Sequence, residues 1–209
     1  MIQTTIKEIP LLFETEATVF SPSSVDTGTL AMLSLAVFSS ADKILDLGCG
    51  YGPVGILAAK LAGEKNVILC DSSPEAVRLA QKNAVLNGLK HLDIRQSDAY
   101  SSIPESNFTL ILSNPPYHTD FSVAKRFIET GFHKLVPGGK IMMVTKRLDW
   151  YKNKLTAVFG GVKITEINGY YVFLSEKRDP LPFYKRQKSS PASGLSKKLQ
   201  RKYKNREKK

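Results

Sequence analysis

Residues 43–53 read Lys-Ile-Leu-Asp-Leu-Gly-Cys-Gly-Tyr-Gly-Pro, an apolar run that is followed at once by a glycine-rich turn. The apolar run predicts a buried strand, and the proline predicts the first turn of a helix, where its missing N–H is not needed. The glycines permit a tight turn and let a ligand lie against the backbone. Because a glycine pattern alone is a weak signal, a strand–helix turn that binds nothing is the alternative.

The chain beyond this turn continues to alternate between strand and helix patterns. The predicted elements are strands at 66–70, 92–96, 108–112 and 140–145, and helices at 53–61, 74–87, 122–136 and 147–158. Asn168-Gly169 lies between the apolar runs 162–167 and 170–174 and predicts an antiparallel hairpin. This order predicts an α/β fold with a doubly wound, mostly parallel seven-stranded sheet that closes with the C-terminal hairpin.

Less regular segments flank this pattern. Residues 1–20 predict short strands or an extended lead-in. Residues 30–38 predict a buried helix, with Asp26 or Thr27 as its N-cap. Ser73 is the expected N-cap of the helix at 74–87. Pro137-Gly138-Gly139 is expected to end the helix at 122–136.

The composition predicts one folded domain, residues 1–178, and a basic, flexible tail, residues 179–209. Apolar residues make up 42% of the chain, and no apolar run approaches the ~20 residues that a membrane span needs. The N-terminus lacks a signal-peptide pattern, and Cys49 and Cys70 are expected to be reduced thiols. The histidines form no metal-ligand spacing with these cysteines. We therefore expect a cytoplasmic protein with no metal site and no membrane partner.

Positive charge is concentrated at the C-terminal end of the chain. Residues 1–176 contain 17 Lys and Arg and 17 Asp and Glu, whereas residues 177–209 contain 13 and 2, which accounts for the whole net charge of +11. Such a segment is typical of proteins that bind phosphate backbones and, less often, of those that bind anionic membrane surfaces. The alternative is a solvated tail that only aids solubility. We expect a nucleic-acid partner.

A second motif follows the apolar run 108–112, where residues 113–117 read Ser-Asn-Pro-Pro-Tyr. Two successive prolines fix an extended turn and remove competing N–H donors. The Asn114 side-chain oxygen and the Pro115 carbonyl can then accept hydrogen bonds from one exocyclic amino group. Tyr117 can stack on the ring that carries this group. The motif therefore predicts a site for a planar amino substrate.

Acidic residues follow the predicted strands in series. Asp46 precedes the first glycine, Asp71 ends the second strand and Asp98 follows the third. An acid at the second of these places suits the two hydroxyls of a ribose. A pyrophosphate would bring two anions close together at Asp46, so an adenosyl ligand with a cationic or zwitterionic end is the better match.

Together these motifs resemble the class I S-adenosylmethionine-dependent methyltransferases, with a Rossmann-like sheet, over nearly all of residues 10–178. Within that group, Val19-Phe20-Ser21, the Asp-Thr-Gly-Thr of 26–29, the Gly-Tyr-Gly-Pro of 50–53 and the Asn-Pro-Pro-Tyr-His of 114–118 are similar to the "methyltransferase small" family. Its ribosomal RNA guanine-N2 methyltransferases usually have Phe at the place of Tyr117. The two-domain members of that group carry an additional N-terminal half. In this chain the basic tail is expected to hold RNA instead.

The resemblance implies S-adenosylmethionine as the cofactor, with contacts from Asp46, Gly48, Gly50, Gly52, Asp71, Asp98 and Asn114. In it, Asp46 lies near the amino-acid end, Asp71 accepts from the ribose hydroxyls and Asp98 accepts from the adenine amino group. The implied catalytic residues are Asn114, Pro115, Pro116 and Tyr117.

The predicted reaction is therefore methyl transfer to an exocyclic amino nitrogen of a nucleobase, most closely guanine N2 in ribosomal RNA or a ribosomal subunit. Two other substrates are possible: adenine N6 in RNA or DNA, and the side-chain amide of a protein glutamine. An RNA-binding protein with a vestigial cofactor pocket is a third possibility. The intact acids, glycines and Asn-Pro-Pro-Tyr motif argue against it.

Overall fold

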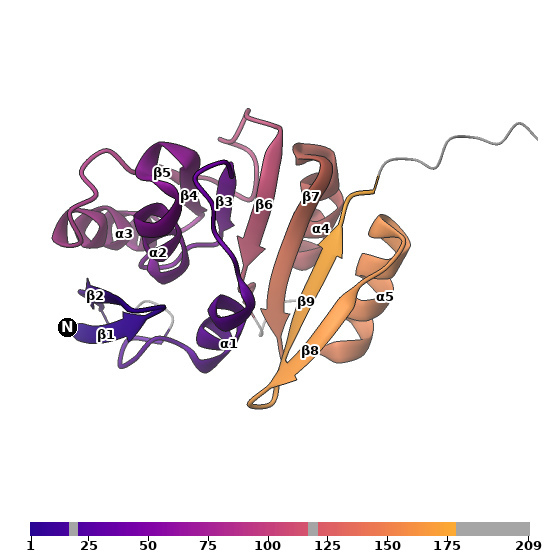
Figure 1. Ribbon diagram of the computed structural model, residues 1–209, viewed down its shortest axis with the longest axis horizontal. Coiled ribbons are helices and arrows are strands. Elements are labelled where there is room, and N and C mark those ends of the chain that lie inside the picture. Colours follow the sequence, from indigo (N-terminus) through magenta and orange to yellow (C-terminus); the bar gives the residue numbers. More distant parts are fainter. Residues whose placement is uncertain (17–20, 117–120, 179–209) are drawn as a thin grey trace, which may run out of the picture. The chain divides into compact units, whose positions relative to one another are not determined.

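The computed structural model describes residues 1–16, 21–116 and 121–178. These residues contain a seven-stranded sheet with the strand order β5-β4-β3-β6-β7-β9-β8 (Figure 1). Its strands are β3 (Ile44–Leu47), β4 (Val67–Asp71), β5 (Asp93–Gln96), β6 (Phe108–Ser113), β7 (Leu135–Thr145), β8 (Lys163–Ile167) and β9 (Tyr170–Glu176). The pairs among β3 to β7 are parallel, and β9 is antiparallel to both of its neighbours. The predicted fold class is confirmed.

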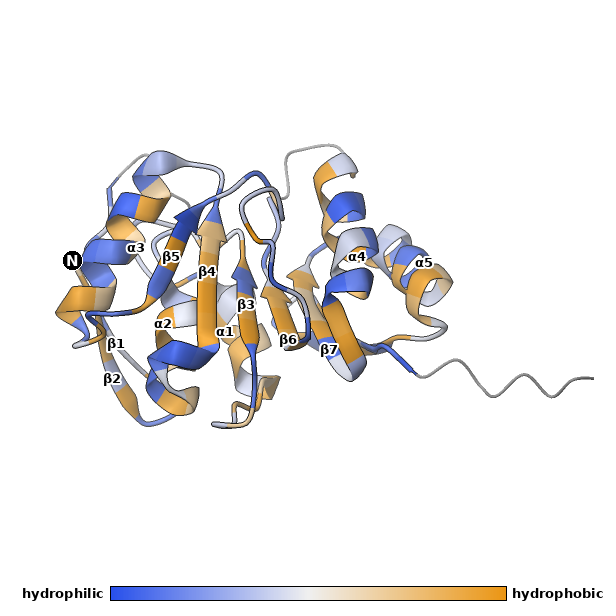
Figure 2. Ribbon diagram, turned by 90° about the horizontal axis from the view of Figure 1, so that it is seen from above, coloured by the Kyte–Doolittle hydropathy of each residue, from blue (hydrophilic) through white to orange (hydrophobic). Residues whose placement is uncertain are grey.

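Helices cover both faces of this sheet. They are α1 (Thr27–Leu35), α2 (Pro53–Ala62), α3 (Pro74–Leu86), α4 (Ser122–Lys134) and α5 (Leu148–Phe159), with a short 3₁₀ helix, η1 (Glu64–Asn66). Among the described residues, no helix is both long and apolar enough to cross a bilayer. The central strands are strongly hydrophobic, and β4 is apolar along most of its length (Figure 2). Such strands suit a parallel sheet that is buried on both faces.

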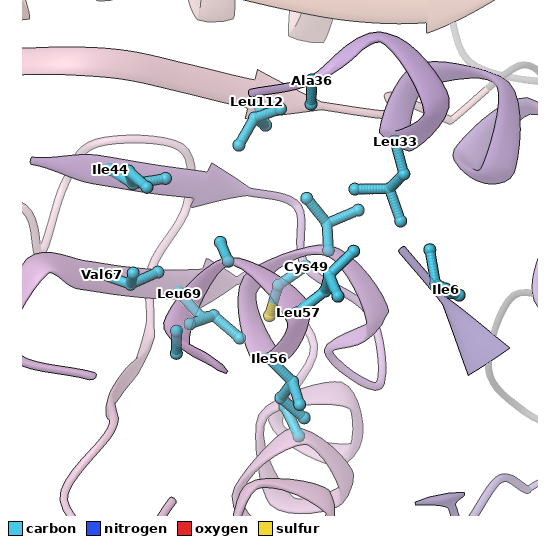
Figure 3. Close-up of a cluster of buried hydrophobic side chains, with 14 of the residues drawn as sticks. Ile6, Leu33, Ala36, Ile44, Cys49, Ile56, Leu57, Val67, Leu69 and Leu112 are labelled. Carbon is cyan, nitrogen blue, oxygen red and sulfur yellow. The ribbon is translucent and has the colours of Figure 1, made fainter. Parts of the chain in front are cut away.

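Alternation along the strands creates two hydrophobic cores. Ile44 and Leu69 point into the core beneath α1, α2 and α3, whereas Leu45 and Ile68 point into the core beneath α4 and α5. Figure 3 shows the first core, where Leu57 of α2 and Leu33 of α1 meet side chains of β3, β4 and β6. The two cores hold the sheet rigid from both sides.

A hairpin of β1 (Ile2–Ile6) and β2 (Ile9–Phe13) forms a separate sheet against α2 and α3. Two buried asparagines, Asn83 of α3 and Asn87 at its C-cap, hold the end of this hairpin that leads to the rest of the chain. Asn87 donates to the Leu12 carbonyl at 2.7 Å and accepts from its amide at 3.1 Å. Asn83 makes the same pair of bonds with Glu14, at 2.9 and 2.7 Å. The strands predicted for the start of the chain are thus confirmed for residues 1–16.

Local signals in the sequence placed several ends correctly. Ser73 caps α3 by accepting from the Ala76 amide at 3.2 Å. Asp26 caps α1 by accepting from the Thr29 amide at 2.9 Å. Asn168 and Gly169 both have positive φ, 52° and 74°, as a two-residue hairpin turn of this kind requires.

Two predicted helix ends were wrong. The first helix ends at Leu35, because Ala36 is already extended. The helix at 122–136 ends at Lys134, and Pro137-Gly138-Gly139 lies inside β7 instead of terminating a helix. Leu135 pairs with Phe108, and Gly138 and Gly139 exchange backbone hydrogen bonds of 2.7 and 2.8 Å with Lys177. The glycines therefore bend a long strand where the pairing of β6 and β7 shifts its register.

Close packing of α2 on β4 generates a test of the fold. A Cβ atom at Gly55 would lie 2.6 Å from both Cδ atoms of Leu69, which is fully buried. We expect Gly55→Ala to lower the free energy of unfolding by about 1–3 kcal/mol, because this core has no room for an added methyl group. Urea unfolding measures the effect.

Gly161→Ala is the matched control. A Cβ atom there meets only the Arg178 guanidinium, at 3.8 Å. Its free energy of unfolding should stay within about 0.5 kcal/mol of wild type. Equal effects at the two glycines would contradict the packing argument.

Candidate active site

A cavity of about 410 Å³ lies at the carboxyl ends of the central strands. It is bordered by residues that follow β3, β4, β5 and β6, together with the start of α1 and part of α4. The chain runs from β3 outward to β4 and β5 and then returns to β6 on the other side of β3. Ligands of open α/β sheets bind at such a reversal of strand order.

The glycine-rich turn forms one wall of the cavity. The amides of Gly48 and Cys49 both donate to the Cys70 carbonyl at 2.9 Å, which fixes the turn to the end of β4. Gly48 and Gly50 border the cavity and have positive φ, 76° and 56°. Gly52 is instead the N-cap of α2, where an added Cβ would lie 2.9 Å from the side chain of Ile56. The structure thus places two of the three predicted glycines at the cavity.

Asp71 is held in place by the backbone. Its Oδ2 accepts from the Gly50 amide at 2.9 Å, and its Oδ1 accepts from the Ser73 amide at 3.0 Å. The carboxylate therefore links the glycine turn to the start of α3 while it borders the cavity. A carboxylate has about four lone-pair sites, so two of these can still accept from a ligand.

Asp46 is an acid buried at the end of β3. It is 2% exposed, and its Oδ2 accepts from the Gly55 amide at 2.8 Å. Burial raises the pKa of this carboxyl from 3.8 to about 7. The hydrogen bond from the Gly55 amide lowers the pKa in part, and the nearby charge of Asp71 raises it by a smaller amount. Since the group also borders the cavity, a ligand cation there would favour its ionised form.

Asp98 has a partner that the sequence did not indicate. Its two oxygens accept from Nη1 and Nη2 of Arg126 at 2.8 and 2.5 Å, a two-pronged ion pair between the turn after β5 and helix α4. Both residues border the cavity. The predicted acid is therefore at the site, but a guanidinium orients it.

The Asn-Pro-Pro motif lies where β6 ends. The buried Ser113 hydroxyl donates to the Leu47 carbonyl at 2.7 Å and ties this end of β6 to β3. Asn114, Pro115 and Pro116 border the cavity. Tyr117, the fourth predicted catalytic residue, lies outside the described residues.

The Asn114 amide is oriented by two acceptors on α1 and its cap. Its Nδ2 donates to Asp26 Oδ2 at 3.0 Å and to Thr29 Oγ1 at 2.9 Å. Asp26 Oδ1 accepts in turn from the Tyr170 hydroxyl at 3.3 Å. The sequence indicated Asp26 only as a helix cap, and nothing in it indicated a contact with a residue 88 positions away.

Gly28 allows this arrangement. An added Cβ would lie 2.5 Å from the Tyr170 ring and 2.9 Å from Asp26 Oδ2. Only glycine therefore lets Tyr170 of β9 approach the start of α1.

Tyr51 is a further residue that the sequence did not single out. It is 3% exposed, and it borders the cavity within the glycine turn. Among the described residues, its hydroxyl is the one buried side-chain polar atom without a hydrogen-bond partner. Burial, with a smaller effect of Asp26, raises its pKa to about 12, so the hydroxyl stays a neutral donor.

The environment of the two thiols disfavours their ionisation. Cys49 and Cys70 are buried and free, as predicted. Burial raises the pKa of the Cys70 thiol to about 12 and also raises that of Cys49 well above its usual value. Both stay protonated at neutral pH, and a thiol in that form is a poor nucleophile.

Among the described residues, the charged side chains that border the cavity are mainly acidic. They are Asp26, Asp46, Asp71, Asp98 and Arg126. Because the one guanidinium is paired with Asp98, the remaining carboxylates favour a ligand with positive charge and disfavour a phosphate.

Comparison with known proteins agrees with this architecture. The uncharacterized protein YbxB of Bacillus subtilis is 30% identical over 171 residues, covering 79% of this chain and 85% of its own length. The ribosomal RNA small subunit methyltransferase C of Hamiltonella defensa is 32% identical over 157 residues, covering 73% of this chain and 46% of that protein. The chain thus spans about half the length of this curated RNA methyltransferase.

A solved structure shows the same relation. The Thermus thermophilus 16S rRNA N2 G1207 methyltransferase, in complex with AdoMet and guanosine, superposes with a TM-score of 0.75 at 26% identity. The match covers 85% of this chain and 50% of that one. The methyltransferase small domain family matches residues 10–175, which include every described residue of the cavity. The chain belongs to the methyltransferase small domain family.

Proposed function

We propose that this protein transfers a methyl group from S-adenosylmethionine to an exocyclic amino nitrogen of a nucleobase, with guanine N2 of ribosomal RNA as the substrate. The observation that carries the proposal is the anchoring of Asn114. Both hydrogens of its Nδ2 are engaged by Asp26 and Thr29. With both Nδ2 hydrogens engaged, this amide can act toward a ligand as an acceptor and not as a donor, and such an acceptor matches a donor such as an amino group. The names of the N2-specific structural relative and of the RNA methyltransferase relatives support this choice.

The cavity suits S-adenosylmethionine in charge and in hydrogen-bonding groups. Asp71 would accept from the ribose hydroxyls, and Asp98 would accept from the adenine amino group while Arg126 holds it in place. Asp46 would face the cationic amino-acid end, where positive charge compensates its burial. Gly48 and Gly50 leave room for the ligand against the backbone.

The residues at the end of β6 would activate the target nitrogen by position. An amino nitrogen on a base is a poor nucleophile, because its lone pair is delocalised into the ring. Asn114 Oδ1 and the Pro115 carbonyl would each accept one of its hydrogens and so turn the lone pair toward the methyl donor. The same oxygens stabilise the positive charge that develops on the nitrogen. S-adenosylmethionine supplies an activated methyl group, and the proton can leave to water afterwards.

The distribution of positive charge supports RNA as the partner. Residues 179–209 carry most of the net charge and would bind the phosphate backbone as a unit distinct from domain 1–178. Within the domain, Lys146 lies 4.7 Å above the ring of Tyr170, the residue that contacts Asp26. This exposed cation therefore adjoins the Asn114 site, where it would attract a phosphate next to the target base. A cytoplasmic location follows from such a substrate.

The reaction and the base can be tested together. Ribosomal subunits from cells that lack this gene are incubated with the protein and methyl-labelled S-adenosylmethionine. Nuclease digestion and nucleoside identification should then place the label in N2-methylguanosine. Label in N6-methyladenosine or in protein would keep the reaction and overturn the substrate. Cofactor binding with no label on ribosomal, transfer RNA or DNA substrates would favour the non-catalytic alternative.

Substitutions of Asn114 and of a residue that anchors it should lower kcat by different amounts. Asn114→Ala should lower kcat by at least ~100-fold, the effect of losing one preorganised polar contact to the reacting group. Thr29→Val removes one of the two acceptors of Nδ2 and should lower kcat less. The affinity for S-adenosylhomocysteine, measured by calorimetry, should change little in Thr29→Val. Turnover of Asn114→Ala near the wild-type value would remove this residue from the mechanism.

Asp46 predicts opposite effects on stability and binding. The pKa of Asp46 is about 7 in the folded protein and 3.8 in the unfolded chain. Between these pH values the folded state therefore binds more protons than the unfolded state. Its contribution to stability is therefore favourable at low pH and is lost as the pH rises from about 4 to about 7.

Asp46→Asn, which keeps an acceptor for the Gly55 amide, should remove this loss. We expect the ligand-free variant to exceed wild type in free energy of unfolding above about pH 7, by on the order of 1 kcal/mol. Its affinity for S-adenosylhomocysteine should fall, because the cationic end of the ligand loses its counter-charge. Urea unfolding across this pH range and calorimetry test both effects, and an unchanged affinity would contradict the role given to Asp46.

A further inference from the structure

Two aromatic rings and a guanidinium lie together where helices α4 and α5 begin. The rings of Phe121 and Trp150 stack in parallel, with 4.3 Å between the centroids and 10° between the planes. The Arg147 guanidinium lies over the Phe121 ring, 4.9 Å from its centroid. We call these three residues the stacking cluster. Val123, two residues after Phe121, borders the cavity, so the cluster adjoins the active site.

The stacking cluster lies at the same edge of the sheet as Asn114. Strands β6 and β7 are parallel and pair Ser113 with Met143, so the residues that follow these two strands leave the sheet side by side. The Arg147 amide donates to Thr145 Oγ1 at 3.2 Å, which fixes the backbone where α5 begins. The arginine is therefore held next to the strand end that carries Asn114.

The stacking cluster lies outside the face of α5 that fills the core. The buried residues of this helix are Tyr151, Leu155 and Phe159. Trp150 and Phe121 are half-buried, and Arg147 is exposed. Both rings of the cluster also meet the Tyr151 ring edge-on. The cluster is thus an exposed arginine on a packed aromatic base.

Charge complementarity favours an RNA strand at this surface. The carboxylates that border the cavity repel phosphate, so the backbone of an RNA substrate has to lie outside it. Lys146 and Arg147 are exposed, Asp149 is the one acid in the first turn of α5, and the N-terminus of this helix adds partial positive charge. Lys146 also lies over the ring of Tyr170, which belongs to the hydrogen-bond network of Asn114.

We propose that the stacking cluster binds the nucleotide adjacent to the target nucleotide of a single-stranded RNA segment. Its base would stack on the Arg147 guanidinium, and its phosphate would lie next to Lys146. A base that is drawn out to reach Asn114 leaves its neighbour without a stacking partner, and aromatic rings and arginine planes provide one. The inference rests on the proposed function, because it takes a nucleobase as the target, and it names the surface that holds the neighbouring nucleotide.

Fluorescence tests the proposal directly, because Trp150 is the only tryptophan in the chain. The full chain is titrated with a single-stranded oligonucleotide of about nine uridines, a length within the usual site sizes for single strands. Polyphosphate is titrated in parallel, because it has the charge of RNA but no bases. We expect saturable quenching by the oligonucleotide and little change with polyphosphate. Arg147→Ala should remove most of the quenching.

Methyl-transfer kinetics give a second readout. Arg147→Ala should raise the KM for the RNA substrate about tenfold or more, as for the loss of one stacked base. Its kcat and its Kd for S-adenosylhomocysteine should stay at the wild-type values, because Arg147 does not border the cavity.

Two variants separate stacking from charge. Lys152→Ala removes a positive charge from the same helix, but Lys152 is exposed and lies two positions from Trp150, on the other side of α5. This control should leave both the quenching and the KM unchanged. Arg147→Lys keeps the charge and loses the planar group, so it should restore little of the quenching. Full restoration by lysine would contradict stacking on the guanidinium.

The outcomes distinguish this inference from the proposed function. If the wild-type protein binds S-adenosylhomocysteine and methylates RNA, but Arg147→Ala changes neither quenching nor KM, the inference alone is overturned. Equal quenching by polyphosphate also overturns it, because the surface would then respond to any polyanion. If the wild-type protein transfers no methyl group, the proposed function fails, and the fluorescence titrations still report whether the stacking cluster binds RNA.

Discussion

The hydrogen bond from the Gly55 amide to the buried Asp46 carboxylate joins the end of β3 to the first turn of α2. Around it, the chain has to make a tight turn, and the helix has to approach β4 closely enough that Gly55 has no room for a side chain. The two requirements reinforce each other. A larger residue at 55 would push α2 away from the sheet and lengthen the bond to Asp46, and the turn between them would then lose its geometry. The shape of the cavity therefore depends on packing beneath it.

This bond also leaves an acid where burial disfavours its charge. Burial raises the pKa of Asp46 from 3.8 to about 7, so an ionised carboxylate at this position lowers the stability of the ligand-free protein. The Tyr51 hydroxyl is a second buried polar group, and among the described residues it has no hydrogen-bond partner. Asp46 lies near the end of β3, and Tyr51 lies in the turn that follows this strand. Ligand binding should thus stabilise this region more than the rest of the domain.

The sequence predicts the fold well because its signals are local. Ser73, Asn168-Gly169 and the apolar strand runs act through residues near them in the chain, and the structure places them as expected. The helix end predicted from Pro137-Gly138-Gly139 was wrong, because backbone pairing with Lys177, about 40 residues away, overrides the local preference of this segment for a turn. The positions of the acids near the ends of β3 and β4 and after β5 were also predictable, because parallel strands bring their carboxyl ends to one edge.

The partners of these site residues were not predictable in the same way. Arg126 meets Asp98 across 28 residues, Asp26 meets Asn114 across 88 and Tyr170 meets Asp26 across 144. Such contacts depend on how helices and strands pack, and no periodicity along the chain encodes them. They also change the chemistry of the residues that the sequence did identify. An asparagine side chain can donate or accept, and in Asn114 the donor nitrogen is already engaged by Asp26 and Thr29.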